Sequence, residues 1–186
     1  MAFKFNKLEI PDIVTITPQS FSDNRGFFFE TFKESEFAQN GIISKFVQDD
    51  FSHSTYGVLR GLHYQKNPCA QAKLLGVLKG KIFDVAVDIR VHSPTFGKWV
   101  GETISEEDHK LIYIPEGFAH GFCVLSNEAD VLYKLTSEYS PKDEMGILWN
   151  DPDINIKWPI DKPLLHEKDS CLPLLKNVNN NFVYMH

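Results

Sequence analysis

Apolar and polar residues alternate along most of this chain with the period of two that is typical of β-strands. The alternation recurs from residue 13 to residue 135 and is interrupted by Gly, Pro, Asn and Asp, while heptads and internal repeats are absent. In the segment from Lys81 to Arg90, one face of the strand is apolar and is formed by Phe83, Val85, Val87 and Ile89. The pattern therefore predicts an all-β fold with a core on that face.

The remaining strands are expected at the short, even spacing of a sandwich or barrel. They are Ile13–Thr17, Phe27–Phe32, Val58–Gln65, Lys73–Leu78, Lys98–Ile104, Lys110–Ile114, Gly121–Leu125 and Val131–Leu135. A jelly roll closes such a set of strands most simply. One short helix is expected from Ser35 to Asn40, because Glu36 suits its N-terminal end and Gly41 suits the position after its last turn.

The segment after Trp149 has no regular pattern. Residues 150–153 have turn chemistry, and Pro159 and Pro163 prevent regular strand pairing. We expect this segment to wrap around the barrel. The Asn-rich tail, residues 176–186, is expected to fray unless its last apolar residues dock on the barrel.

Length and composition fit a single soluble domain spanning residues 1–186. Hydrophobic residues make up 42% and charged residues 24% of the 186 residues, as in ordinary globular proteins. The N-terminus lacks the apolar core of a signal peptide, and no apolar run approaches the roughly 20 residues of a membrane span. We therefore expect a cytoplasmic protein without a membrane partner, in which Cys69, Cys123 and Cys171 are reduced thiols.

The net charge of −6 argues against nucleic acid as a partner. It still permits a local cationic pocket for a small phosphorylated ligand. Arg25, Arg60 and Lys73 are the candidate residues for such a pocket.

The most informative segment is the strand-like run from Val58 to Gln65, which carries Arg60 and His63. A strict period of two would place these side chains on opposite faces, so one site can use both only if Gly61 marks a bulge or sharp twist. The alternative is an edge strand in which the Arg reaches water and the His is hydrogen-bonded. These eight residues alone do not separate the two interpretations.

Residues 115–120 form a P-x-G-x-x-H turn, which resembles the second sequence motif of cupins. The first cupin motif requires an H-x-H pair with a nearby Glu for a metal site, but here His63 is followed by Tyr64 and Gln65. His53 lies ten residues upstream of His63, does not resemble a cupin ligand pair, and is expected at the surface. We therefore expect no metal.

Further motifs extend the resemblance over nearly the whole chain. They are Arg25–Glu30, Phe46–Asp49, Val58–Gln65, Gln71–Leu74, Phe83–Arg90, Ser93–Gly97, Ile114–Phe122, Tyr133–Lys134, Trp149–Pro152 and Lys168–Asp169. In this order they resemble the dTDP-4-dehydrorhamnose 3,5-epimerase family. The resemblance implies a cupin-like double-stranded β-helix, or jelly roll, with a few short helices. It also implies a cofactor-independent epimerase that inverts C3 and C5 of a dTDP-4-keto-6-deoxyhexose.

Such a reaction needs a base on one face of the sugar, an acid on the other and a group that stabilises the enolate between them. By the resemblance, His63 is the base with Asp169 as its partner, Tyr133 is the acid, and Lys73 holds the enolate oxygen. Without the resemblance, the ordinary interpretation would be a solvated carboxylate for Asp169, a structural tyrosine for Tyr133 and a solvent-facing lysine for Lys73. Asp84 is expected in a polar network beneath His63, and a purely structural hydrogen bond is an equal alternative.

The resemblance also implies a set of substrate-binding residues. Arg25 and Arg60 would contact the diphosphate, whose oxygens suit the planar guanidinium. His120 and Gln48 would contact the diphosphate-sugar region. Phe27 and Tyr139 would enclose the thymine ring, with Glu30 at its polar edge. The expected assembly is a homodimer in which residues 25–30 reach the neighbouring site.

Two positions depart from the usual pattern of that family. Asp50 follows Gln48-Asp49 where the family usually has Asn, which puts a carboxylate near the binding site, and Gly76 replaces a common Arg, which suggests a lost positive charge at the pocket mouth. We favour neutral drift, but another nucleotide, another sugar or epimerisation at one carbon remain alternatives. Outside this class, the alternatives are a metal-dependent cupin enzyme and a non-catalytic sugar-nucleotide binding module.

Overall fold

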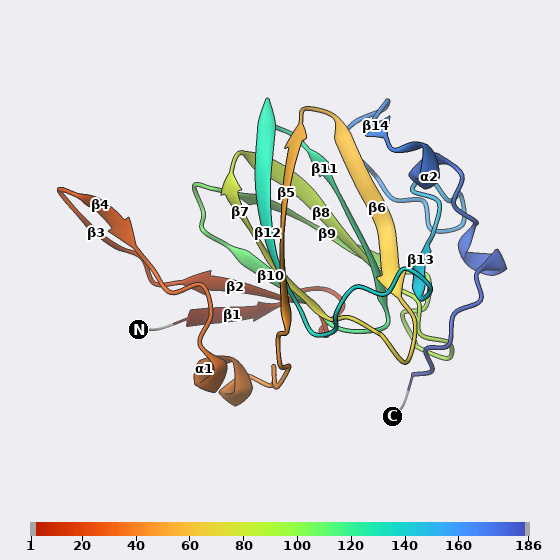
Figure 1. Ribbon diagram of the computed structural model, residues 1–186, viewed down its shortest axis with the longest axis horizontal. Helices are drawn as coiled ribbons and strands as arrows, with labels where there is room; N and C mark the ends of the chain where they lie inside the picture. The colour runs from red at the N-terminus through yellow and green to blue at the C-terminus, as the bar shows by residue number, and fades with distance from the viewer. Residues whose placement is uncertain (1–2, 185–186) are drawn as a thin grey trace.

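Two facing β-sheets form a jelly roll in the computed structural model, which describes residues 3–184 (Figure 1). The strands of the first sheet are β1 (Phe3–Lys7), β2 (Val14–Pro18), β5 (Gln48–Thr55), β7 (Lys73–Lys79), β10 (Leu111–Ile114) and β12 (Glu128–Leu135). Those of the second are β6 (Val58–Gln65), β8 (Lys81–Asp88), β9 (Trp99–Ser105), β11 (Phe118–Val124), β13 (Glu144–Gly146) and β14 (Leu164–Leu165). The predicted all-β jelly roll is confirmed.

The first sheet has the order β1-β2-β10-β7-β12-β5, and the second has the order β13-β6-β11-β8-β9, with β14 paired in parallel to β6. The short strands β3 (Phe21–Asp23) and β4 (Gly26–Phe28) form a separate hairpin that projects from the body (Figure 1). The helices are also short: α1 (Glu34–Gln39), α2 (Glu167–Ser170) and the 3-10 helix η1 (Leu175–Asn177).

The main core lies between the sheets, where alternate residues of each strand point inward. Leu75 and Val77 of β7 pack in one cluster with Ala86 of β8 and Phe122 of β11. The outer face of the second sheet is buried as well, because the C-terminal segment covers it. Both faces of β8 are therefore buried, although the sequence pattern predicted a core on one face only.

Most predicted elements are present within a few residues of their expected ends. The predicted helix appears as α1, and Gly41 follows it with a positive φ of 85°. The strand predicted from Phe27 to Phe32 is wrong, because β4 ends at Phe28 and belongs to the projecting hairpin, where the run of phenylalanines is exposed.

Strands β1, β3, β5, β13 and β14 and the helices α2 and η1 were not predicted. Strand β5 is the clearest case: it lies at a sheet edge, and most of its side chains are polar and exposed. Such a strand lacks the apolar alternation that marks half-buried strands.

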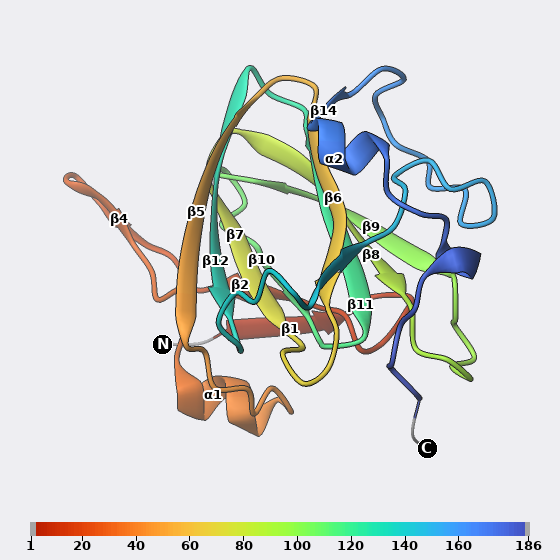
Figure 2. The same ribbon diagram turned by 45° about the vertical axis from the view of Figure 1, so that its right-hand side comes forward.

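The C-terminal segment wraps around the barrel as expected (Figure 2). Leu164 and Leu165 pair with the start of β6, and α2 lies against the same strand. Phe182 is buried, and Val183 bridges to Val91, so the tail is docked as far as residue 184; Met185 and His186 lie outside the described residues. Across residues 3–184, no helix has the length and apolarity needed to span a bilayer.

Candidate active site

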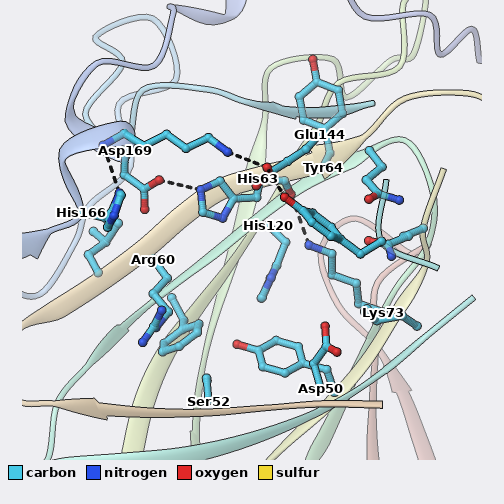
Figure 3. Close-up of a pocket in the computed structure, with 18 of the residues that line it drawn as sticks. Asp50, Ser52, Arg60, His63, Tyr64, Lys73, His120, Glu144, His166 and Asp169 are labelled. Atoms are coloured by element: carbon cyan, nitrogen blue, oxygen red, sulfur yellow. Dashed lines mark hydrogen bonds and ion pairs between the residues drawn. The ribbon is translucent and has the colours of Figure 1, made fainter. Parts of the chain in front are cut away.

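A cavity of about 830 Å³ lies between the two sheets and is closed on one side by the segment that carries α2 (Figure 3). Eight of the residues singled out from the sequence line it: Asp50, Arg60, His63, Lys73, His120, Tyr133, Tyr139 and Asp169. The folded chain therefore brings together residues that are separated by more than 100 positions in the sequence.

A bulge in β6 lets Arg60 and His63 face the same cavity. Arg60 pairs with Phe122 of β11, but His63 pairs with His120, so two residues of β6 lie opposite one residue of β11. Gly61 lies in this bulge with a φ of 122°, and a Cβ there would lie 2.6 Å from the Cα of Gly121. The predicted bulge at Gly61 is confirmed.

His63 and Asp169 form a direct pair at the cavity wall (Figure 3). His63 Nε2 lies 2.7 Å from Oδ1 of Asp169, and the Gly61 amide donates to Oδ2 at 3.3 Å. Burial alone would raise the pKa of Asp169, but its hydrogen bonds and the nearby imidazole hold that pKa below the ordinary value. The ionised carboxylate accepts a hydrogen bond from Nε2–H. With the proton on Nε2, Nδ1 carries the free lone pair and can act as the base.

Lys73 projects from β7 into the cavity, and its Nζ lies 3.4 Å from the carbonyl oxygen of His63. Burial lowers the pKa of Lys73 to about 8, against the opposing attraction of Asp84, Glu144 and Asp50. The side chain is therefore a cation near neutral pH that loses its charge readily.

Tyr133 faces the cavity interior from β12, as the alternation predicted, and so approaches from the opposite sheet to His63. Its ring packs edge-on to His120, with ring centroids 6.3 Å apart. Burial raises the pKa of the Tyr133 phenol well above its ordinary value. The phenol therefore keeps its proton and remains a hydrogen-bond donor.

Asp84 and His120 form a second, fully buried pair on neighbouring strands β8 and β11. His120 Nε2 lies 2.7 Å from Oδ2 of Asp84, while Oδ1 has no hydrogen-bond partner among the described residues. Burial lowers the pKa of His120 despite this carboxylate, which favours the neutral ring. Asp84 is thus hydrogen-bonded to His120. It is connected to His63 only through His120, which pairs with His63 across β11 and β6.

The polar groups near the cavity mouth are already oriented by hydrogen bonds. Arg60 donates from Nε to Ser54 Oγ at 3.0 Å and from Nη2 to the carbonyl oxygen of His53 at 3.2 Å. The His53 side chain is exposed and is bonded to Asp130, in line with its expected surface position. Arg60, which lines the cavity, is therefore held in place by two hydrogen bonds to β5.

Gln48 does not line the cavity but connects two residues that do. Its Nε2 donates to Asp50 Oδ1 at 2.9 Å, and its Oε1 accepts from the Tyr139 amide at 2.8 Å. The Asp50 carboxylate therefore has a neutral donor beside it, which reduces its repulsion of an anionic ligand.

Arg25, Phe27 and Glu30 do not line the cavity of their own chain. Arg25 pairs with Asp23 in the projecting hairpin, and Phe27 is exposed and stacks on Phe29 with ring centroids 5.9 Å apart. One Glu30 oxygen is buried without a hydrogen-bond partner among the described residues.

The inference that Gly76 leaves a charge missing at the pocket mouth is wrong. Lys73 and Leu75 point inward from β7, so Gly76 faces the other side of the sheet, where it pairs with Leu111. A Cβ at this position would meet the Leu111 side chain. Gly76 thus lies in the outer packing layer and not at the cavity.

Sequence reasoning missed several cavity residues, of which Glu144 and Lys168 make the most specific contacts. Glu144 Oε2 accepts from Lys168 Nζ at 2.5 Å and from the Tyr139 hydroxyl at 2.7 Å. The position of Lys168 beside Asp169 was a usable signal for Lys168. Glu144 had none, because β13 is only three residues long and has no recognisable pattern.

Across residues 3–184, no group of three or more His, Cys, Asp or Glu side chains is arranged to hold a metal ion. The three cysteines, at positions 69, 123 and 171, are free thiols.

Comparisons with known proteins point to one family. A family model described as dTDP-4-dehydrorhamnose 3,5-epimerase matches residues 7–177. A curated protein of that name from Shigella flexneri is 56% identical over 164 residues, which cover 88% of this chain and 91% of the relative.

Solved structures agree with this match. The epimerase RmlC of Legionella pneumophila in complex with dTDP-4-keto-L-rhamnose has a TM-score of 0.93 and 46% identity, covering 96% of this chain and 95% of that one. A 3′-monoepimerase of Streptomyces bikiniensis in complex with dTDP-quinovose has a TM-score of 0.86 and 34% identity, covering 91% and 87%.

Proposed function

The chain belongs to the dTDP-4-dehydrorhamnose 3,5-epimerase family, and from this premise we propose roles for the residues of its cavity. Its reaction is the inversion of C3 and C5 in dTDP-4-dehydro-6-deoxy-D-glucose, which gives dTDP-4-dehydro-L-rhamnose. The proposed catalytic residues are His63, Asp169, Tyr133 and Lys73.

The 4-keto group acidifies the C–H bonds at C3 and C5, so a base can remove either proton. Nδ1 of His63 takes the proton, the C–H electron pair moves into the ring as a carbon–carbon double bond, and negative charge develops on O4. The ionised Asp169 stabilises the imidazolium, and the Lys73 cation stabilises the enolate in a partly dry cavity.

Tyr133 then donates its phenolic proton to the opposite face of the same carbon, and the double bond returns to the ketone. The inverted centre is complete at this point, and proton exchange with solvent restores His63 and Tyr133. The high pKa of the buried phenol keeps it protonated until the enolate, a stronger base, accepts the proton.

The observation that carries this proposal is the pairing of His63 with Asp169 on the wall of a cavity that Tyr133 enters from the opposite sheet. The test is incubation of the protein with the dTDP-4-keto sugar in D2O, followed by NMR. Deuterium at both carbons is expected, and the absence of deuterium from both would overturn the proposal. His63→Asn should remove the exchange while leaving the fold intact.

Epimerisation at a single carbon is the second candidate, because a 3′-monoepimerase is among the structural neighbours. The same NMR experiment separates the two, since a mono-epimerase would place deuterium at one carbon only. A metal-dependent reaction would be lost on treatment with a chelator, and a binding module would bind the nucleotide sugar without any exchange.

For binding, we propose that Arg60 contacts the diphosphate, with His120 and Gln48 near the diphosphate-sugar region and Tyr139 against the thymine ring. Arg60 and Tyr139 both line the cavity and are fixed by hydrogen bonds, which supports this arrangement. Weaker binding of dTDP by Arg60→Ala, measured by calorimetry, is the expected result.

We also propose a homodimer in which residues 25–30 complete the neighbouring site. The support is the projecting hairpin, in which Arg25 and exposed Phe27 lie away from the cavity of their own chain (Figure 1). Mixing inactive His63→Asn with poorly binding Phe27→Ala should restore activity, because a mixed dimer contains one intact site. Failure of exchanged subunits to restore activity would refute the shared site.

A cytoplasmic location is the remaining proposal. The three free thiols support it, because disulfides are rare in reducing compartments. Cell fractionation with an antibody against the protein tests it.

A further inference from the structure

The helix that carries Asp169 is held to the barrel by few contacts. Helix α2 has four residues, and the two-residue strand β14 precedes it. One side of the helix is fixed by Asp169 itself, through His63 and the Gly61 amide. A segment this short has little stability of its own, so its position depends on contacts with other elements.

An ion pair fixes the other side of α2. Lys168, the residue before Asp169, donates from Nζ to Glu144 Oε2 of β13 at 2.5 Å. The Tyr139 hydroxyl donates to the same oxygen at 2.7 Å. The Lys168 ammonium and the Tyr139 hydroxyl thus converge on one carboxylate oxygen at the cavity rim, from positions 24 and five residues away from Glu144.

The Glu144 carboxylate is suited to this task because it is ionised and well shielded. Burial would raise the pKa of Glu144, but Lys168 and Tyr139 outweigh it and hold the pKa below its ordinary value. The Glu144 side chain is 19% exposed, whereas that of Lys168 is 51% exposed. The carboxylate is therefore the more shielded partner of the pair.

We propose that Glu144 and Lys168 are positioning residues that hold α2 so that Asp169 stays on His63. This inference rests on the proposed catalytic role of the His63–Asp169 pair. It assigns the ion pair an effect on the rate of proton transfer that is exerted through Asp169. A direct contact of Lys168 or Glu144 with the nucleotide sugar would instead act on substrate binding.

The two effects differ in steady-state kinetics. Misalignment of Asp169 with His63 lowers kcat and leaves KM nearly constant. Loss of a contact that binds the substrate and the transition state equally well raises KM. For Lys168→Met we expect kcat to fall by about 10- to 100-fold, as for other displacements of catalytic groups by about 1 Å, with KM within about twofold. Lys168→Arg keeps the charge and should retain most of kcat.

A double-mutant cycle with Asp169→Asn gives the decisive readout. If Lys168 acts through Asp169, the variant carrying both Lys168→Met and Asp169→Asn has the same kcat as Asp169→Asn alone. If the effects of the two substitutions multiply, the inference is overturned. A KM effect without a kcat effect also overturns it.

The matched control is Lys79→Met, which breaks another exposed lysine–glutamate pair of the same 2.5 Å length, formed with Glu128 outside the cavity. It should leave kcat and KM unchanged.

Glu144→Gln is the second variant if Lys168→Met does not fold, and it should show the same non-additivity with Asp169→Asn. Absence of deuterium exchange in the unmodified protein would refute the proposed function instead, so the two failures are distinguishable.

Discussion

The His63–Asp169 pair offers a prediction whose size follows from the geometry. Asp169→Asn replaces a buried carboxylate 2.7 Å from the imidazole with a neutral amide. Two unit charges about 4 Å apart at an effective dielectric constant of about 20 attract by about 4 kcal/mol. A neutral hydrogen bond recovers about 1 kcal/mol of this. The imidazolium in the transition state therefore loses about 2–3 kcal/mol, or about 30- to 200-fold in kcat.

The assay is the rate of deuterium incorporation from D2O at saturating dTDP-4-keto sugar, followed by NMR. Circular dichroism and the thermal midpoint establish that the variant is folded. The control is Asp153→Asn, which changes an exposed carboxylate paired with Lys176 in the same C-terminal segment and should leave the rate unchanged. A folded Asp169→Asn protein that loses less than about threefold in rate would show that the carboxylate does not stabilise the imidazolium.

Three further predictions concern other parts of the site. Burial lowers the pKa of Lys73 to about 8, so its positive charge is lost as the pH rises above 8, and kcat/KM should decline over that range. A flat profile above pH 8 would contradict this role. Gly61→Ala should lower the free energy of unfolding by about 2–4 kcal/mol in urea titrations, because its Cβ would overlap Gly121 at a positive φ. An unchanged urea midpoint would argue against the tight bulge. Tyr133→Phe should still exchange substrate protons through His63 but form inverted product about 10²–10⁴-fold more slowly, and full product formation would remove Tyr133 from the acid role.

The sequence was sufficient to predict the strands of the barrel and many of the side chains that point into it. Period-two alternation located strands such as Lys81–Asp88, because successive side chains of a strand point to opposite faces. The break at Gly61 was readable for the same reason, since only a bulge brings Arg60 and His63 into one cavity. The partnership of His63 with Asp169 depended on resemblance, because a contact between residues 106 positions apart leaves no local pattern.

The errors also have physical causes. Phe27 and Phe28 read as a core strand because sequence patterns record apolarity but not whether a sheet is available to pair with. Gly76 was assigned to the pocket from its position in a motif, whereas its outward direction follows from counting residues from Lys73. Glu144 was missed because the three-residue strand β13 has no recognisable pattern and its partner Lys168 lies 24 residues further along the chain.

The C-terminal segment covers the second sheet and also carries Asp169, which has a consequence for the stage of protein synthesis at which the chain becomes active. His63 leaves the ribosome more than 100 residues before its partner does. A nascent or truncated chain that ends before α2 therefore lacks the partner of His63 and one wall of the cavity. Such a chain should generate little free enolate, so the enzyme gains its reactivity only in the last stage of its synthesis.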